Sequence, residues 1–383
     1  MTETVHTETV HTETGNTETV HTETGNTETM KAAVWHAAGD VRVEDVPLPR
    51  DLRPDEVIVK VDLACICASD LAEYRDGPHV IPVERPHRLT GKQAPVTLGH
   101  EFVGRVTATG AAVGHLSIGD RVCGDACLRC GTCFWCQRGE YNICEYGGSI
   151  GLHSDGAFAE YLKVPDYTLY RVPDAVDDQA AAIVEPLAVG FHALERGRFT
   201  AGETVVVVGF GMVGAAVTLI AAAIGAARVV VVESSPARAE AARKAGATDV
   251  LAPGRELRNQ IRALTSGRGA DIVCDCTGLA AVLPSSVELS RRGGRVVICG
   301  IAHEPSAVRA DRIVYFEREV IGSLGYRRAH EAVLRLLETG RLDVGWLFAK
   351  PIGLEQVVSQ GLDVMGSDSG TGCLRIPVVI TGA

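Results

Sequence analysis

The first 29 residues contain no lysine and no arginine, although they hold six glutamates. The whole chain of 383 residues has 37 basic and 48 acidic residues and a formal net charge of -11, so removing the six charges of this stretch leaves -5. A strongly basic face is the usual footprint of nucleic-acid binding. The charge balance therefore gives no indication of a nucleic-acid partner, and it predicts a mildly acidic folded part.

Long apolar runs are also missing. No stretch reaches the roughly 18 residues of a membrane span, and the longest candidate, residues 213–227, contains glycines and predicts a buried helix. The start of the chain lacks a basic segment followed by an apolar one, so we expect no secretory signal. The 12 cysteines then predict metal ligands or free thiols rather than disulfides, and a reducing, cytoplasmic location.

Residues 1–29 repeat a polar pentapeptide, as in HTETV and HTETG. Five residues are too few for one unit of a solenoid, and the segment offers almost no side chains to bury, so we interpret it as a disordered tail. Weak metal binding by His6, His11 and His21 is the alternative.

From residue 30 the pattern divides the chain into two kinds of sequence. Short alternating strands dominate residues 30–181 and return in residues 326–383. Between them, over residues 182–325, apolar strands and helices alternate, which is typical of parallel βαβ units. We therefore predict an α/β protein in which a doubly wound Rossmann domain is inserted into a mainly β domain.

The run VVVVGFGMVG places Gly209, Gly211 and Gly214 in G-x-G-x-x-G spacing between a valine strand and an apolar helix. This is the context in which such glycines bind the pyrophosphate of a dinucleotide at a helix N-terminus. Glu233 ends the next strand, where an acid binds the adenosine ribose and repels a 2′-phosphate, so NAD is favoured over NADP. Ser234 and Arg238 keep NADP open as an alternative. The expected cofactor contacts are Gly209, Gly211, Met212, Val213, Gly214, Glu233, Arg238 and Thr277.

Four cysteines on one short loop follow the spacing C-x2-C-x2-C-x7-C: Cys130, Cys133, Cys136 and Cys144. Four thiolates suit tetrahedral zinc and fill every position around it, which is the pattern of a structural site. A set of free thiols is the alternative.

A second group of metal-ligating residue types is scattered along the chain. Cys67 follows a predicted strand, His100 and Glu101 enter another, and Glu185 opens the helix that leads into the nucleotide-binding domain. A catalytic zinc takes three protein ligands and keeps one position open. Because the same chain also carries a four-cysteine loop and a dinucleotide motif, a catalytic zinc site is the favoured interpretation of these residues.

From residue 30 nearly to its end, the sequence resembles the zinc-containing medium-chain dehydrogenase/reductase family. The motifs that carry the resemblance are CASD, GHE, GDRV, CGTCFWC, DGAFAEY, VEPLAV, GFGMVG and GSLGYR. Within the family, the stretch between Cys67 and His100 and the GSLGYR motif look closest to the 2,3-butanediol dehydrogenase group.

The resemblance implies a GroES-like catalytic domain over residues 30–181 and 326–383, and a Rossmann domain over residues 182–325. It makes Cys67, His100 and Glu185 zinc ligands and Glu101 a nearby second carboxylate. Ser69 would relay the proton of the bound alcohol. The sequence departs from the family pattern at Ala72, where many members have a histidine, so the proton is expected to leave by water, the cofactor ribose or another side chain such as Tyr74.

These observations predict a zinc- and NAD-dependent enzyme that moves a hydride between a secondary alcohol or vicinal diol and the cofactor. A polyol, an amino alcohol or a specialised-metabolite alcohol is an alternative substrate. A zinc-independent reductase and a non-catalytic NAD-binding protein are the alternatives in other classes. The resemblance also implies a homodimer or homotetramer joined through the nucleotide-binding domains.

Overall fold

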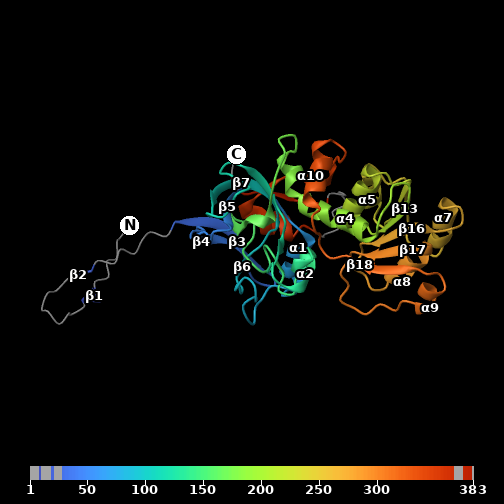
Figure 1. Ribbon diagram of the computed structural model, residues 1–383, viewed down its shortest axis with the longest axis horizontal. Helices are drawn as coiled ribbons and strands as arrows, with labels where there is room; N and C mark the ends of the chain where they lie inside the picture. Colours follow the sequence, from blue (N-terminus) through green and yellow to red (C-terminus); the bar gives the residue numbers. More distant parts are fainter. Residues whose placement is uncertain (1–7, 10–18, 21–27, 366–373, 382–383) are drawn as a thin grey trace.

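The computed structural model describes residues 8–9, 19–20, 28–365 and 374–381. The repeat segment lies mostly outside these residues; within it, β1 (Glu8–Thr9) pairs antiparallel with β2 (Thr19–Val20). His6, His11 and His21 are outside the described residues, so their metal binding and the disorder of the tail stay predictions. The remainder forms two halves joined through α4 (Val184–Arg196), as Figure 1 shows.

The first half is built on antiparallel β-structure. A seven-stranded sheet has the order β12-β8-β7-β5-β20-β19, with β11 also paired to β5, and a three-stranded sheet has the order β4-β3-β6. The strands are β3 (Thr29–Ala37), β4 (Asp40–Pro47), β5 (Glu56–Cys65), β6 (Val96–Thr97), β7 (Glu101–Thr109), β8 (Arg121–Gly124), β9 (Cys127–Leu128), β10 (Gly148–Ser149), β11 (Tyr161–Pro165), β12 (Leu169–Arg171), β19 (Ile352–Gly353) and β20 (Pro377–Val379).

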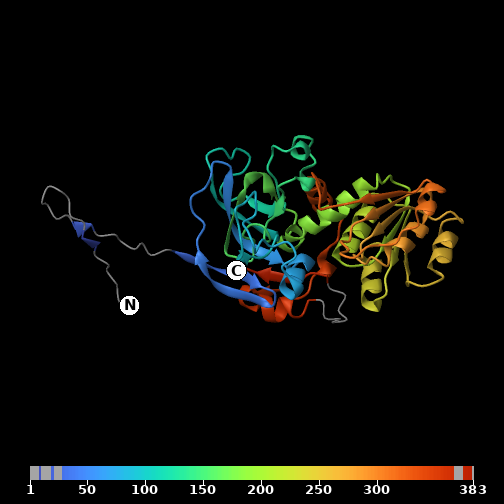
Figure 2. The same ribbon diagram turned by 90° about the horizontal axis from the view of Figure 1, so that it is seen from below.

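The end of the chain lies in this first half, because β20 pairs antiparallel with β5 and places Pro377 opposite Cys65. Figure 2 shows this C-terminal segment, in red, against the blue N-terminal strands. The helices here are α1 (Ala68–Asp76), α2 (Phe134–Gln137), α3 (Asp178–Ala182), α4 and α10 (His330–Glu338). Single turns are formed by η1 (Tyr141–Ile143), η2 (Asp166–Thr168), η3 (Gly345–Leu347), η4 (Leu354–Gln356) and η5 (Val357–Leu362).

The second half is a six-stranded parallel sheet in the order β15-β14-β13-β16-β17-β18, the doubly wound order of dinucleotide-binding folds. Its strands are β13 (Thr204–Val208), β14 (Arg228–Val232), β15 (Asp249–Leu251), β16 (Ala270–Asp275), β17 (Ser290–Ile298) and β18 (Glu319–Gly322). Its helices are α5 (Met212–Ala223), α6 (Pro236–Lys244), α7 (Leu257–Leu264), α8 (Leu283–Leu289) and α9 (Ala310–Val314). The predicted fold class is confirmed.

Consecutive valines explain why two inner strands of this sheet are buried. Val205–Val208 of β13 and Val229–Val232 of β14 are buried, as expected for parallel strands covered by helices on both faces. Helix α5 ends four residues before the predicted position, since Gly225 adopts a positive φ of +97° that a helix cannot continue through.

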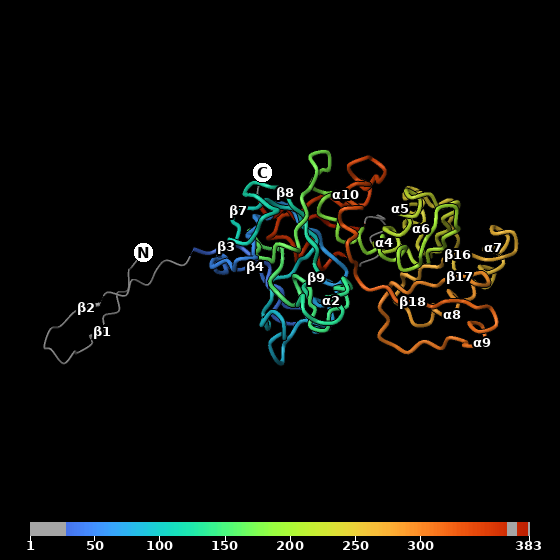
Figure 3. The backbone as a smooth tube through the Cα atoms, in the orientation of Figure 1, coloured from blue at the N-terminus to red at the C-terminus, as the bar shows by residue number. Residues whose placement is uncertain are grey.

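One apolar core runs through both halves and includes buried residues of α3, α4, α5 and α10. Helix α4 packs closely on α5 because Gly190 has no Cβ; a Cβ there would lie 2.6 Å from Ala216. The tube in Figure 3 shows α4 between the two halves. Residues at the start of α4 are therefore held where the two halves meet. Among the described residues, no helix is long and apolar enough to cross a membrane.

Candidate active site

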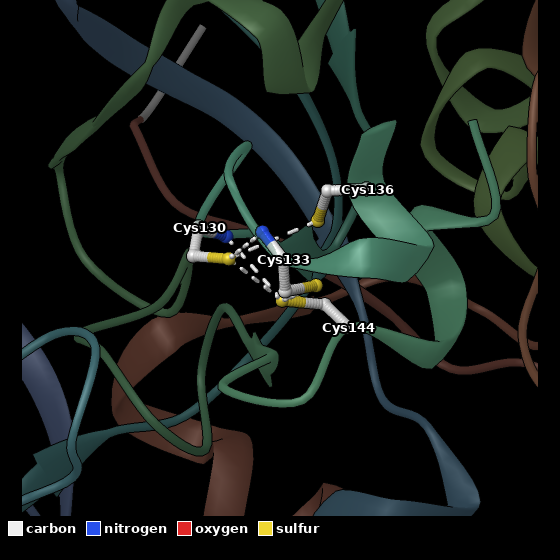
Figure 4. A group of neighbouring side chains, drawn as sticks. All are labelled: Cys130, Cys133, Cys136 and Cys144. Carbon is white, nitrogen blue, oxygen red and sulfur yellow. Dashed lines mark hydrogen bonds between the residues drawn. The ribbon is translucent and has the colours of Figure 1, made fainter. Parts of the chain in front are cut away.

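The four cysteines of the predicted structural site converge, as Figure 4 shows. The Sγ of Cys144 lies 3.5 Å from that of Cys130 and 3.9 Å from that of Cys133, and the Sγ atoms of Cys130 and Cys136 are 4.0 Å apart. A zinc–sulfur bond of about 2.3 Å in a tetrahedron requires sulfur–sulfur distances of about 3.8 Å. The cluster therefore fits one zinc ion with all four positions filled by protein.

Backbone N–H groups prepare this loop for a metal. The N–H of Cys133 donates to Cys130 Sγ at 3.3 Å, and the N–H of Cys130 donates to Cys144 Sγ at 3.4 Å. Backbone donors, with Thr132 the strongest, lower the pKa of Cys130 to about 6. Because zinc binds the thiolate rather than the thiol, these donors favour the metal-binding form.

A second convergence joins Cys67, His100 and Glu101, whose ligand atoms all lie within 4.8 Å of one another. Cys67 is the N-cap of α1, and its backbone N–H donates to Asp70 Oδ2 at 2.9 Å. Glu101 begins β7 and is paired with Cys65 of β5, so the sheet register brings it beside the start of α1. Three residues that the sequence predicts as one site are thus adjacent, and their chemical types fit zinc.

Asp70 forms an ion pair with the imidazole of His100. Its Oδ1 is 3.6 Å from His100 Nδ1, while His100 Nε2 lies 3.4 Å from Ser69 Oγ on the opposite side of the ring. Burial disfavours the charged ring, but the negative charges of Asp70 and Cys67 outweigh it and raise the pKa of His100 well above its usual value. A carboxylate behind a metal-binding histidine fixes the ring and raises its basicity, which leaves Nε2 as the ligand atom.

Glu101 has a permanent partner. Arg375 donates from Nε to Glu101 Oε2 and from Nη2 to Glu101 Oε1, both at 2.7 Å, and both side chains are fully buried. Arg375 was not predicted from the sequence. The signal that could have identified it is a charged residue within the otherwise apolar stretch LRIPVVI, residues 374–380.

Glu185 lies in the first turn of α4 and is not among the residues whose ligand atoms lie within 4.8 Å of one another. Burial raises the pKa of Glu185 to about 7, and its charge interacts with His100 and Glu101. The hydroxyl of Tyr326, which lowers the pKa of Glu185, accepts a hydrogen bond from Ala126 N at 2.8 Å. Among the described residues, Glu185 forms no ion pair, whereas Glu101 is paired with Arg375. Tyr326 is a second residue of the site that the sequence analysis missed.

The proton route expected from the sequence is only partly available. Ser69 lies beside His100, as predicted, but Ala72 carries no group that can pass on a proton. Tyr74, the suggested substitute, donates its hydroxyl proton to Asp363 Oδ1 at 2.7 Å. This hydrogen bond leaves the part of Tyr74 in the proton route a prediction.

The dinucleotide motif has the required backbone geometry. Gly209, directly after β13, has a φ of +87°, and a Cβ on Gly214 would lie 2.0 Å from Gly209 O. Gly211 is the N-cap of α5, and a Cβ there would meet nothing within 4 Å. The first turn of α5, with Met212 and Val213, therefore presents free N–H groups to open space that suits a pyrophosphate.

Glu233 follows β14 at the same edge of the sheet. It accepts backbone N–H bonds from Phe210 at 2.8 Å, Ser234 at 2.7 Å and Ser235 at 2.8 Å. Partial burial would raise the pKa of Glu233, but these donors lower it below its usual value. The carboxylate is thus ionised at neutral pH. Arg238 stays exposed nearby, and the methyl group of Thr277 closes over Gly209.

The fold and the two cysteine-containing clusters together define a two-domain, zinc-dependent dehydrogenase. Residues 53–174 match the alcohol dehydrogenase GroES-like domain, and residues 212–339 match the zinc-binding dehydrogenase family. The chain belongs to this family of zinc-binding alcohol dehydrogenases.

Individual relatives agree with this family assignment. The chain is 35% identical to (R,R)-butanediol dehydrogenase of Bacillus subtilis, over 88% of this chain and 96% of that protein. The crystal structure of 2R,3R-butanediol dehydrogenase from Bacillus subtilis has a TM-score of 0.86 and 34% identity, covering 91% of this chain and 99% of that one. A putative zinc-binding dehydrogenase from Sinorhizobium meliloti, bound to NADP, has a TM-score of 0.81 and 30% identity, with coverages of 92% and 99%.

The chain is therefore an oxidoreductase that acts on CH–OH donors with zinc and a nicotinamide cofactor. The alternatives of a zinc-independent reductase and of a non-catalytic binding protein are not favoured.

Proposed function

We propose that the enzyme oxidises a secondary alcohol or vicinal diol of the 2,3-butanediol kind with NAD, at a site formed by Cys67, His100 and the neighbouring carboxylates. The observation that carries this proposal is the convergence of Cys67, His100 and Glu101 within 4.8 Å. The relatives named butanediol dehydrogenase support the substrate class.

Cys67, His100 and Glu185 are the proposed zinc ligands. Glu101 lies nearer to Cys67 and His100, but both of its oxygens are already bound to Arg375. Burial raises the pKa of Glu185 to about 7, although the positive charges of His100 and Arg375 act to lower it. A divalent ion bound beside Glu185 would add a further positive charge, so the ion and the carboxylate would stabilise each other. Glu185→Gln is expected to lower the zinc content of the site more than Glu101→Gln does. A larger loss of zinc in Glu101→Gln would instead make Glu101 the ligand and Glu185 the neighbouring carboxylate.

The closed cluster of Cys130, Cys133, Cys136 and Cys144 is the proposed site of a second, structural zinc. Its Sγ distances of 3.5 to 4.0 Å support four-sulfur coordination with no position for substrate.

A zinc ion held by Cys67, His100 and Glu185 would supply a Lewis acid for the substrate oxygen, and a nicotinamide bound at the glycine turn would supply the hydride acceptor. Ser69, whose Oγ is 3.4 Å from His100 Nε2, holds the hydroxyl proton of the substrate. Asp70 keeps the His100 ring in place. Because Ala72 has no polar side chain and Tyr74 is bound to Asp363, the proton passes from Ser69 to water.

The cofactor is proposed to be NAD. The ionised Glu233, with its three backbone N–H donors, supports this choice because it repels a 2′-phosphate. Arg238 is the group that favours NADP.

A homodimer is proposed to form through the nucleotide-binding half. Strand β18 is the outer strand of its sheet, and it carries Val320 at 38% exposure. Val314, Tyr315 and Leu324, next to it in the chain, are 72%, 76% and 52% exposed. An uncovered apolar edge strand is unusual in a monomer. Light scattering of the purified protein tests this association, and a monomeric mass would contradict it.

The dense thiols support a reducing, cytoplasmic location.

The substrate assignment is tested by NADH formation from a panel that contains the stereoisomers of 2,3-butanediol, simple secondary alcohols, polyols and amino alcohols. The highest kcat/KM is expected with a vicinal diol or a simple secondary alcohol. A clear preference for a polyol or an amino alcohol would contradict the assignment while leaving the zinc chemistry intact.

A further inference from the structure

A cavity of about 760 Å³ lies at the amino ends of the parallel strands. Glu203 precedes β13, Asp271 is the second residue of β16, and Arg318 precedes β18. The glycine turn of the cofactor site lies at the opposite, carboxyl edge of the same sheet. Figure 1 shows α7, which contributes to the cavity wall, on the side of the nucleotide-binding half that faces away from the first half. The cavity is therefore separate from the active site.

Six arginines line this cavity, against two carboxylates: Arg258, Arg262, Arg268, Arg291, Arg292 and Arg318. The two carboxylates are already paired, Asp271 with Arg291 at 2.6 Å and Glu203 with Arg295. This leaves an excess of four positive charges among the lining residues, in a chain whose net charge is -11. Like charges held together repel one another, so an anion bound among these arginines would be electrostatically favoured.

Neighbouring acids do not remove this excess. Glu288 is shared: its Oε2 lies 3.9 Å from Arg258 and its Oε1 lies 3.6 Å from Arg318. Arg262 and Arg268 form no ion pair with any residue that the structure describes. Arg262 lies in the last turn of α7 and Arg268 follows it closely in the chain, so two unpaired guanidinium groups share one wall.

Arg318 gives the cavity a buried cation. The residue is 7% exposed, and its Nη2 donates to Ser290 O at 2.8 Å. Among the described residues, its Nε has no hydrogen-bond partner, and its Nη1 has only the ion pair with Glu288 Oε1 at 3.6 Å. Burial lowers the pKa of this guanidinium. Buried donors are normally satisfied, so the unpartnered Nε indicates that an acceptor from a ligand would be favourable here.

An aromatic ring holds the cations in place. The guanidinium carbons of Arg292 and Arg318 lie 4.7 and 4.9 Å from the centre of the Phe316 ring. Contacts of this kind are attractive and fix the planes of the guanidinium groups. Preorganised guanidinium forks match the paired oxygens of phosphate.

We propose that this cavity is a binding site for a small oligophosphate, an anion with two or more linked phosphoryl groups. The excess of four positive charges matches the charge of such a chain, and the volume of about 760 Å³ admits it. A free inorganic oligophosphate and the phosphate tail of a nucleotide share this chemistry. The site is distinct from the dinucleotide site, whose pyrophosphate binds at the N-terminus of α5.

The test is calorimetric titration of the full-length, zinc-loaded enzyme with pyrophosphate and with tripolyphosphate, at an ionic strength of about 0.15 M. The enzyme is saturated with NAD beforehand, so that the cofactor site is closed to the probe, and its zinc content is measured before and after. We expect one saturable site per chain that binds tripolyphosphate more tightly than pyrophosphate. Adenosine triphosphate as a third titrant distinguishes a nucleotide from the free anion by any further gain in affinity.

The variant pair is Arg262→Gln/Arg268→Gln and the control Arg85→Gln/Arg255→Gln. All four side chains are exposed, so both double variants are expected to fold, and both lower the positive charge equally. Arg85 and Arg255 do not line the cavity. We expect the first variant to lose about tenfold or more in affinity, and the control to change less than twofold. The absence of saturable binding to the wild type, or equal losses in the two variants, would overturn the proposal.

Discussion

Arg375, close to the C-terminus, holds both carboxylate oxygens of Glu101 at 2.7 Å, although 274 positions separate the two residues in the chain. The same guanidinium lies 4.0 Å from Cys67 Sγ. A buried cation thus stands directly behind the proposed metal site and neutralises the carboxylate next to His100. The C-terminal segment of the first half therefore contributes a residue that contacts the proposed metal site.

Arg375→Leu is expected to lower the free energy of unfolding by about 3–5 kcal/mol, because it leaves the buried Glu101 charge without a partner. The double variant Arg375→Leu/Glu101→Gln should recover most of that loss, since the uncompensated charge is then gone. Urea unfolding followed by tryptophan fluorescence measures both. Equal destabilisation of the single and the double variant would show that Arg375 acts by packing rather than by charge.

Cys144→Ser is expected to reduce the zinc content from two ions to one per chain and to lower the melting temperature, because a structural zinc contributes folding free energy directly. Elemental analysis of the purified protein gives the count. Cys276→Ser is the matched control, a partly buried thiol outside both clusters, and it should retain two ions. Two ions in Cys144→Ser would exclude the four-sulfur site.

Glu233→Ser is expected to raise the ratio of kcat/KM for NADP over NAD by about tenfold or more, because the carboxylate that repels a 2′-phosphate is removed. Glu240→Ser removes an exposed acid from α6 and serves as the control for a general change in charge. If the ratio stayed the same in Glu233→Ser, the cofactor preference would have to come from another residue.

The buried His330 is expected to lower the free energy of unfolding in acid. Burial lowers the pKa of His330 from 6.5 to about 4, and its Nε2 lies 3.1 Å from Gly124 O. Below pH 6.5 the unfolded chain binds the proton more readily than the folded one, so stability falls as the pH decreases from about 6.5 to about 4. Between pH 7 and pH 5 this residue should account for about 2 kcal/mol.

Urea unfolding at the two pH values measures this effect. His330→Gln keeps a donor for Gly124 O but does not titrate, so it should lose about 2 kcal/mol less than the wild type over the same interval. The exposed His303→Gln should behave like the wild type. An unchanged pH dependence in His330→Gln would show that His330 is not the titrating group.

The contrast between the two cysteine-containing clusters shows what the sequence could predict. Cys130, Cys133, Cys136 and Cys144 lie on one loop, so their spacing alone constrains their geometry. The glycines around Gly211 are similarly local, and the valine strands beside them predict the doubly wound sheet. Short-range spacing of this kind can be recognised in the sequence, because residues so close in the chain can form such a site in only a few backbone conformations.

Arg375 and Tyr326 could not be predicted in this way. Each acts through a partner far away in the chain, Glu101 in one case and Ala126 in the other. The first contact depends on β20 pairing with β5, and the second on α10 and its preceding loop packing against α4. Such contacts are properties of the tertiary structure, and no periodicity near residues 326 or 375 indicates them. The hydrogen bond from Tyr74 to Asp363 is a third example.

Cys67 and its neighbours are proposed to hold the zinc at which the alcohol is oxidised. The most direct test is the rate of NADH formation from 2,3-butanediol by the wild type and by Cys67→Ser, with zinc counted in both preparations. Cys67→Ser is expected to lose one of two zinc ions and at least about a thousandfold in kcat/KM, because the metal contributes several kcal/mol to the transition state. Two retained zinc ions together with near-normal turnover in Cys67→Ser would contradict this proposal.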